Sequence, residues 1–140
     1  MLYSLFGGGG VGAVVDISLL LGKRLDQVDK DDFSWGFTFS GGLNLRVECL
    51  WRLLVSGKVV ITSEDHGQQF GLPAPVDCVG ELRRIEGVSV TSAKVRAGTV
   101  DIALDFGDIA TLEVIGTSAG YEAWVLSGPD ILIVGQPGYE

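Results

Sequence analysis

Strict alternation of apolar and polar residues in short runs is the feature of this sequence that most constrains its fold. In residues 33–40 the apolar side chains fall on one face and small polar ones on the other. The apolar positions are Phe33, Trp35, Phe37 and Phe39. Because side chains of a strand point to opposite faces in turn, such a run is typical of a strand with one buried face. Gly41-Gly42 then predicts a hairpin turn, since glycine reaches positive φ without a steric cost.

The second half of the chain repeats the same order of features. Each half has an alternating strand that ends in Phe, a glycine turn, an L-x-V strand, a Trp strand and a short β-branched strand. The matched positions are Phe39 with Phe106, Leu45 with Leu112, Val47 with Val114, Trp51 with Trp124, and Gly57 with Gly128. The Phe-to-Trp spacing is 12 residues in the first half and 18 in the second, which predicts a longer loop around residues 116–120. We interpret the pattern as an internal duplication, in which Trp51 and Trp124 both lie in the core.

These patterns predict a single, mainly β (α+β) domain over residues 1–140. We expect antiparallel strands from two duplicated meander units to close as a barrel or a sandwich, because a single meander cannot bury its own face. One or two short helices are expected, one of them capped near Asp77 and ended at Gly87. The expected segments are a glycine-rich N-terminal arm (1–14), a first repeat unit (15–62), a connector (63–75) and a second repeat unit (76–138).

The net charge of −8 at pH 7 limits the classes of partner. Nucleic acids and anionic membrane surfaces both require Lys and Arg, so we expect neither as a partner. A protein partner, of basic character, is the expectation that suits this charge. Residues 1–70 carry −2 and residues 71–140 carry −6, so a charged binding face is expected in the second half.

The N-terminal segment and the two cysteines bear on the cellular location. Residues 1–15 are apolar but have no positively charged start and are interrupted by glycines, which differs from a secretory signal. Cys49 and Cys78 are too few for a disulfide scaffold and have no metal-ligand spacing. We therefore expect a cytoplasmic protein with two buried thiols.

Two motifs with catalytic or cofactor associations occur, and neither has the expected context. Gly7, Gly9 and Gly12 satisfy G-x-G-x-x-G, but antiparallel hairpins follow instead of the βαβ unit that this motif requires. Asp65-His66 places the only histidine beside a carboxylate. A hydrolase reading needs these two side chains to converge with a Ser, a Thr or another carboxylate in a cleft. We favour a turn capped by Asp65, and predict no enzyme, metal site or cofactor.

The candidate binding residues lie in the more acidic second half. Four carboxylates fall on the outward side of the hairpin predicted over residues 100–115, namely Asp101, Asp105, Asp108 and Glu113. A solvated face is the simpler interpretation, and a partner-binding patch is the functional one. Tyr121 and Glu122, in the run Y-E-A-W, are expected near the end of a sheet and complete the candidate set.

The run Y-E-A-W-x-L-x-G-P (residues 121–129), the strand 131–134 and Pro137-Gly138 resemble a family of small, largely actinobacterial proteins of unknown function. Members carry an L-x-L-x-F strand, an L-x-V strand, Y-E-x-W and a final P-G-G turn. The resemblance covers roughly residues 76–138 and implies no assigned activity. This chain departs from the pattern because it lacks the second glycine and the terminal apolar strand. An open sheet edge would then favour a homodimer.

Three functions follow as alternatives. The first is a non-enzymatic interaction domain that resembles an immunity or antitoxin protein and covers a basic partner with an acidic face. The second is a small-ligand-binding β-barrel, with Trp35 and Phe37 lining its cavity. The third is the hydrolase that would use Asp65 and His66.

Overall fold

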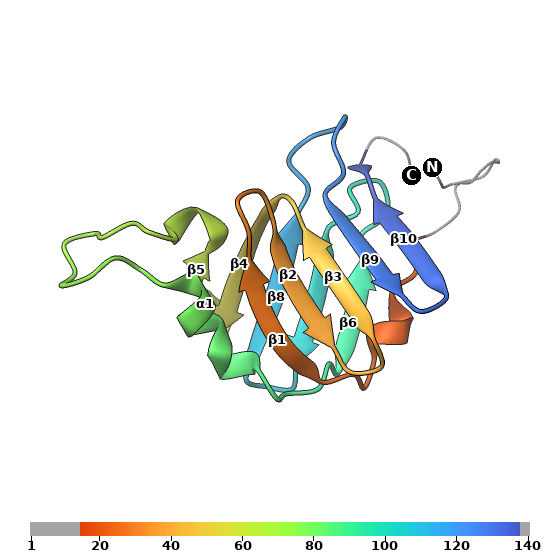
Figure 1. The fold of residues 1–140 in the computed structure, drawn as a ribbon, viewed down its shortest axis with the longest axis horizontal. Helices are drawn as coiled ribbons and strands as arrows, with labels where there is room; N and C mark the ends of the chain where they lie inside the picture. The colour runs from red at the N-terminus through yellow and green to blue at the C-terminus, as the bar shows by residue number, and fades with distance from the viewer. Residues whose placement is uncertain (1–14, 138–140) are drawn as a thin grey trace.

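In a computed structural model that describes residues 15–137, the chain folds into two five-stranded antiparallel sheets that face each other (Figure 1). The front sheet of Figure 1 has the order β1-β2-β3-β9-β10, with strands Leu25–Lys30, Trp35–Phe39, Leu43–Val47, Trp124–Gly128 and Ile131–Gly135. The back sheet has the order β5-β4-β8-β7-β6, with strands Lys58–Thr62, Leu50–Val55, Ala110–Ile115, Ile102–Phe106 and Ser92–Val95. The mainly β class is confirmed, and within the described residues the sheets do not close into a barrel. The predicted arm (1–14) and its G-x-G-x-x-G motif lie outside those residues, as does Gly138 at the end of the second predicted unit.

The helical segments are short. The α-helix α1 (Cys78–Glu81) runs directly into the 3₁₀ helix η3 (Leu82–Ile85), and two other 3₁₀ turns are η1 (Ser18–Leu20) and η2 (Ser63–Asp65). Asp77 caps α1 as predicted, since its carboxylate accepts a hydrogen bond from the backbone N–H of Gly80. No helix among residues 15–137 has the length and hydropathy needed to cross a membrane.

Each half of the chain contributes three strands to one sheet and a hairpin to the other. Strands β1, β2 and β3 are joined by the β9–β10 hairpin, and β6, β7 and β8 are joined by the β4–β5 hairpin. The registers are equivalent, because Val47 pairs with Trp124 and Val114 pairs with Trp51. This equivalence supports the duplication, which stays a prediction about origin.

The strand registers correct one of the predicted matches between the halves. In the hairpins that cross to the other sheet, Gly128 pairs with Ile131 and Val55 pairs with Lys58. Gly128 is therefore the counterpart of Val55, and the predicted match of Gly128 with Gly57 is wrong. The error arose because a glycine can mark either the last strand residue or the turn itself.

One hydrophobic core fills the space between the sheets. Trp51 and Trp124 are both completely buried, as the duplication predicted. Trp35 contacts Trp51 across the two sheets, with ring centroids 5.0 Å apart and planes at 86°. This edge-to-face arrangement is a preferred geometry for aromatic rings and ties β2 to β4. Phe33, which alternation placed on the same face as Trp35, is instead 89% exposed and lies in the β1–β2 turn.

Two strands, β1 and β6, were not predicted. In β1 a register irregularity between Leu25 and Gln27 leaves Leu25 and Val28, three residues apart, both buried. A bulge of this kind destroys the period of two by which a strand is recognised. Strand β6 has only four residues and no fully buried side chain, so its sequence carries little pattern.

Candidate functional site

The two connections that cross between the sheets lie side by side at one end of the molecule. Residues 48–49 connect β3 to β4, and residues 116–123 connect β8 to β9. Pairing of Val47 with Trp124 and of Leu50 with Ile115 brings the two connections together. The second connection is six residues longer, which equals the difference between the two Phe-to-Trp spacings and confirms the predicted longer loop. The two halves of the fold therefore differ most at this end.

A pocket of about 260 Å³ lies at this end, and we call it the end pocket. Three of its lining residues come from the first half, Phe33, Glu48 and Cys49. Five come from the longer β8–β9 connection, Thr117, Ser118, Tyr121, Glu122 and Ala123. None of these lining residues is basic. The end pocket thus combines two exposed aromatic side chains with two carboxylates.

Backbone hydrogen bonds hold the two connections against each other. The N–H of Glu48 donates to the carbonyl oxygen of Ala123 at 2.9 Å, and the N–H of Ala123 donates to the carbonyl oxygen of Gly135 at 2.7 Å. A chain of main-chain contacts therefore extends from the β3–β4 connection through the β8–β9 connection to β10. These hydrogen bonds fix the backbone at Glu48 and at the residue that follows Glu122, and so hold the segments that carry the two carboxylates.

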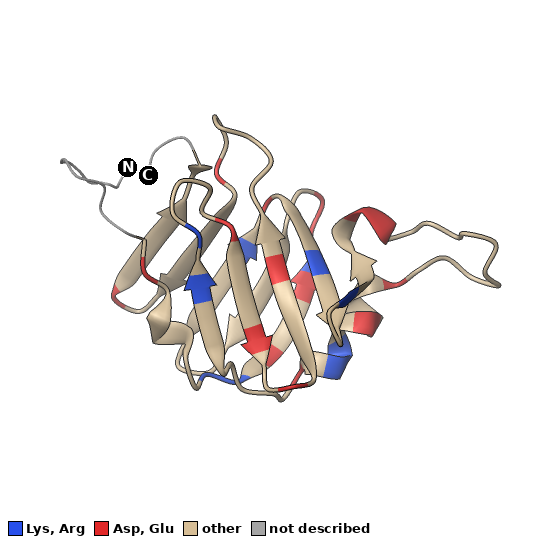
Figure 2. Ribbon diagram, turned by 180° about the vertical axis from the view of Figure 1, so that it is seen from behind, with Lys and Arg blue, Asp and Glu red and all other residues tan. Residues whose placement is uncertain are grey.

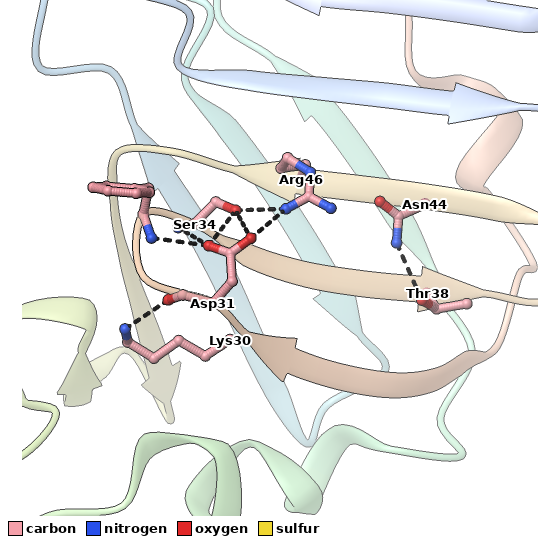
Figure 3. A network of polar contacts seen from close by, with 7 residues as sticks. Lys30, Asp31, Ser34, Thr38, Asn44 and Arg46 are labelled. Atoms are coloured by element: carbon pink, nitrogen blue, oxygen red, sulfur yellow. Dashed lines mark hydrogen bonds and ion pairs between the residues drawn. The ribbon is translucent and has the colours of Figure 1, made fainter.

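Phe33 is presented by a turn that Asp31 organises (Figure 3). One carboxylate oxygen of Asp31 accepts hydrogen bonds from the N–H groups of Phe33 at 2.9 Å and Ser34 at 2.7 Å. These two bonds, chiefly, lower the pKa of Asp31 below its ordinary value. The guanidinium of Arg46 donates to the other carboxylate oxygen at 3.1 Å and to the hydroxyl of Ser34 at 2.5 Å. Two neighbouring side chains donate other hydrogen bonds. Asn44 donates to the hydroxyl of Thr38, and Lys30 donates to the carbonyl oxygen of Asp31.

The carboxylates of the end pocket repel each other. Partial burial of Glu48 and the nearby negative charge of Glu122, in that order, raise the pKa of Glu48. The positive charge of Arg46 acts in the opposite direction with a smaller effect, and Asp31 adds a further small increase. Arg46, which is held by Asp31 and Ser34, therefore offsets the repulsion only in part. The end pocket is therefore a site of negative charge that its surroundings compensate only in part.

Neither the thiol of Cys49 nor the hydroxyl of Ser118 in the end pocket has the features of a nucleophile. Burial, together with the charges of Asp101 and Glu48, raises the pKa of Cys49 to about 12. A thiolate is the reactive form of cysteine, so this thiol is a poor nucleophile at neutral pH. The hydroxyl of Ser118 accepts hydrogen bonds from the N–H groups of Gly120 and Tyr121. Its role is to shape the loop.

Asp65 and His66 serve the local structure. The carboxylate of Asp65 accepts from the N–H of Thr62 at 2.9 Å in a capping box at η2. His66 accepts from the N–H of Cys78 through Nδ1 at 3.1 Å, and its ring packs edge-on against Trp35 at 5.4 Å between centroids. The two side chains bond to separate partners, and the capped turn that we favoured is what the structure contains.

The four predicted acids of the second half occupy separate environments. Glu113 forms an ion pair with Arg52 of the adjacent strand at 2.5 Å, and Asp105 accepts from the hydroxyl of Thr111 at 2.7 Å. Asp101 accepts from the N–H of Gly116 at 2.9 Å, under the β8–β9 connection, whereas Asp108 lies exposed in the turn at the other end of β7. Figure 2 shows this sheet from outside, with Lys and Arg positions interleaved among the Asp and Glu positions.

The structure brings Tyr121 and Glu122 together with two residues that sequence reasoning did not select. Alternation placed Phe33 only on the apolar face of a predicted strand, and the sequence pattern did not single out Glu48. The sequence could not link the short β3–β4 connection to Tyr121, because more than 70 residues separate them. The same separation hides the link between Tyr121 and Arg46, the positively charged partner of Asp31. Within residues 15–137, no three His, Cys, Asp or Glu side chains are grouped so that they could hold a metal ion.

Comparisons of this chain with protein-family models, with curated proteins and with solved structures found no match. The family resemblance of residues 76–138, the cytoplasmic location and the homodimer therefore stay predictions. The inference about function rests on the geometry and charge of the end pocket.

Proposed function

We propose that this protein is a non-enzymatic interaction domain that binds a basic protein partner at the end pocket. The observation that carries the proposal is the pair of carboxylates, Glu48 and Glu122, which raise the free energy of the unbound site because they repel each other without a basic neighbour in the pocket lining. A cationic group of a partner would relieve this repulsion on binding. From the sequence we expected the partner to bind the acidic face of the β7–β8 hairpin. We now propose that it binds at the end pocket instead.

The size of the end pocket favours a protein partner over a free small ligand. Its volume of about 260 Å³ lies below the roughly 300–1,000 Å³ that is usual for small-molecule sites. One side chain of a partner fits this volume. The alternative function, a small-ligand-binding barrel, relied on Trp35 and Phe37, which are instead buried and packed against Trp51.

The charge of the whole chain supports the same class of partner. A net charge of −8 accelerates the approach of a basic protein. An immunity protein that covers a basic toxin surface is one role of this kind, and the family resemblance is what suggests it.

An NMR titration tests this proposal without knowledge of the natural partner. The probe is a tetralysine peptide, added to the ¹⁵N-labelled protein at low ionic strength, with tetraglutamate as the negative control. We expect saturable shifts of the backbone amides of residues 48–49 and 117–123, which weaken with added salt. Tetraglutamate should cause none.

Two variants of equal net charge separate the end pocket from the acidic face. Glu122→Gln removes a carboxylate of the pocket, and Asp108→Asn removes one from the β7–β8 turn. We expect Glu122→Gln to weaken binding of tetralysine and Asp108→Asn to leave it within experimental error. Shifts centred on residues 105–113, or an equal effect of the two variants, would overturn the location of the site; absence of saturable binding would overturn the function.

A further inference from the structure

We infer that the end pocket recognises an alkylammonium group, the side chain of a lysine, which the rings of Phe33 and Tyr121 contact while Glu48 and Glu122 supply the opposite charge. This inference rests on the proposed function and names the chemistry of the bound group. It depends on three observations: the exposure of the two rings, the way their backbones are held, and the placement of the carboxylates.

The two aromatic residues of the end pocket are exposed although the chain buries comparable residues elsewhere. Phe33 is 89% exposed and Tyr121 is 79% exposed, whereas Phe37 and Phe39 are buried in the core. Exposed aromatic surface has an unfavourable hydration free energy unless a ligand covers it. A ring face also attracts a cation through its quadrupole, and this attraction increases when water is excluded. Two exposed rings beside two carboxylates therefore form a surface suited to an organic cation.

Both rings are carried by turns with the same local construction. The N–H of Phe33 donates to the carboxylate of Asp31 at 2.9 Å, and the N–H of Tyr121 donates to the hydroxyl of Ser118 at 3.2 Å. In each case an acceptor side chain two or three residues earlier fixes the backbone of the aromatic residue itself. Such a turn holds its aromatic residue at the pocket before any ligand arrives, which reduces the entropy lost on binding.

The carboxylates are better suited to an ammonium than to a guanidinium. A guanidinium gains most from one carboxylate that accepts two parallel N–H bonds in a planar fork. Here Glu48 and Glu122 come from different connections and provide two separate acceptors. The three donors of a lysine ammonium point in different directions and can reach separate acceptors. Its alkyl stem leaves apolar surface for the rings of Phe33 and Tyr121.

The test uses three capped amino acids as probes, the N-acetyl methylamides of lysine, arginine and norleucine. Norleucine has the shape of the lysine stem without the charge. In NMR titrations we expect the lysine probe to bind with a dissociation constant about threefold or more below that of arginine. The norleucine probe should give no saturable shift.

Ring-removing variants decide the role of the aromatic residues. Phe33→Leu and Tyr121→Leu should each weaken binding of the lysine probe about two- to fivefold, the range for a cation–π contact at an exposed site. Tyr121→Phe keeps the ring and should bind like the unmodified protein. Since both side chains are exposed, none of these changes removes core packing.

The outcomes separate this inference from the function on which it rests. If tetralysine binds in a Glu122-dependent way but the two leucine variants bind the lysine probe normally, the inference is wrong and the proposed function stands. Tighter binding of the arginine probe also overturns the inference alone. If neither tetralysine nor any cationic probe binds, both are wrong.

Discussion

Trp51 and Trp124 occupy equivalent buried positions in the two halves of the fold but differ in one hydrogen bond. The indole N–H of Trp124 donates to the carbonyl oxygen of Val100 at 2.8 Å. The indole N–H of Trp51 is buried and has no acceptor among the described residues. The difference originates in the loops before β2 and β7, of which only the second places a carbonyl within reach of its tryptophan.

Val100 reaches this position through an unusual backbone conformation. Its φ is +55°, in the left-handed region that β-branched residues rarely adopt, and its side chain is completely buried. Residues 96–101 between β6 and β7 number two more than residues 31–34 between β1 and β2. The longer loop accommodates Val100, and the shorter one instead forms the turn that presents Phe33.

The hydrogen bond predicts unequal effects of the same substitution in the two halves. Trp124→Phe would leave the buried carbonyl oxygen of Val100 without a donor, whereas Trp51→Phe removes a donor that has no acceptor. We expect Trp124→Phe to lower the free energy of unfolding by about 1–3 kcal/mol more than Trp51→Phe. Urea unfolding of both variants measures the difference. If Trp124→Phe costs no more stability than Trp51→Phe, this expectation is wrong.

Close packing of Trp124 against Gly135 predicts a second effect on stability. A Cβ added to Gly135 would overlap the indole ring of Trp124. We expect Gly135→Ala to lower the free energy of unfolding by about 1–3 kcal/mol, the usual range for overpacking a core. Gly120→Ala is the control, since the nearest atom to its added Cβ would be 4.0 Å away. If thermal unfolding shows the two variants to be equally stable, the packing described here is wrong.

The raised pKa of Glu48 predicts a stabilising substitution at the proposed site. A carboxyl whose pKa is raised by folding binds more protons in the folded state, so its ionisation reduces stability as the pH rises above about 4.5. Glu48→Gln should therefore raise the thermal unfolding temperature at pH 7 and have no effect near pH 3.5. Because the side chain is largely exposed, the gain is limited to about a few tenths of a kcal/mol.

The same variant should lose function while it gains stability. Glu48→Gln removes one of the two charges offered to a cation, so binding of tetralysine should weaken although the fold is more stable. Destabilisation at pH 7 would contradict the origin assigned to the pKa shift. Unchanged binding would contradict the role of Glu48 in the site.

The lowered pKa of Asp31 predicts the opposite pH dependence. A carboxyl whose pKa is lowered by folding stabilises the protein above its ordinary value of 3.8, and this contribution is lost as the pH falls through the lower folded value. Asp31→Asn should therefore lower the unfolding temperature at pH 7 and approach the unmodified protein at pH 2. Binding of the lysine probe should also weaken, because the turn that presents Phe33 loses its ion pair with Arg46.

Asp32→Asn is the matched control for this prediction, since it removes the same charge from the adjacent exposed residue. We expect it to change neither the unfolding temperature nor the binding of the lysine probe beyond experimental error. If both asparagine variants behave alike at pH 7, the effect is one of net charge and the network of Figure 3 does not position Phe33.

Several elements of the fold were predictable because they depend on neighbours in the chain. Alternation in residues 35–39 and 102–106 located β2 and β7, and Gly41-Gly42, with φ of 83° and 77°, formed the predicted turn. The bulge in β1 removed the same signal from residues 25–30. Alternation also predicted, wrongly, that Phe33 lies in the core, because the pattern cannot show that the strand begins only at Trp35.

The candidate site was predictable only in part. The run Y-E-A-W identified Tyr121 and Glu122 at the end of a sheet, where they lie beside β9. The number of acids on the β7–β8 hairpin suggested a binding face. One of them, Glu113, is paired with Arg52, which lies on the adjacent strand but 61 residues earlier in the sequence. Charge along one strand does not reveal the charge on the strand beside it.

The sequence by itself determined where most strands and turns form, which faces are apolar, and that both halves share one order of features. These properties follow from side-chain alternation and local backbone preferences, which act over a few residues. Only the tertiary structure decided that each half exchanges a hairpin with the other sheet, and so placed residues 48–49 beside residues 116–123. That choice depends on burying both sheet faces in one core, a requirement of the whole chain.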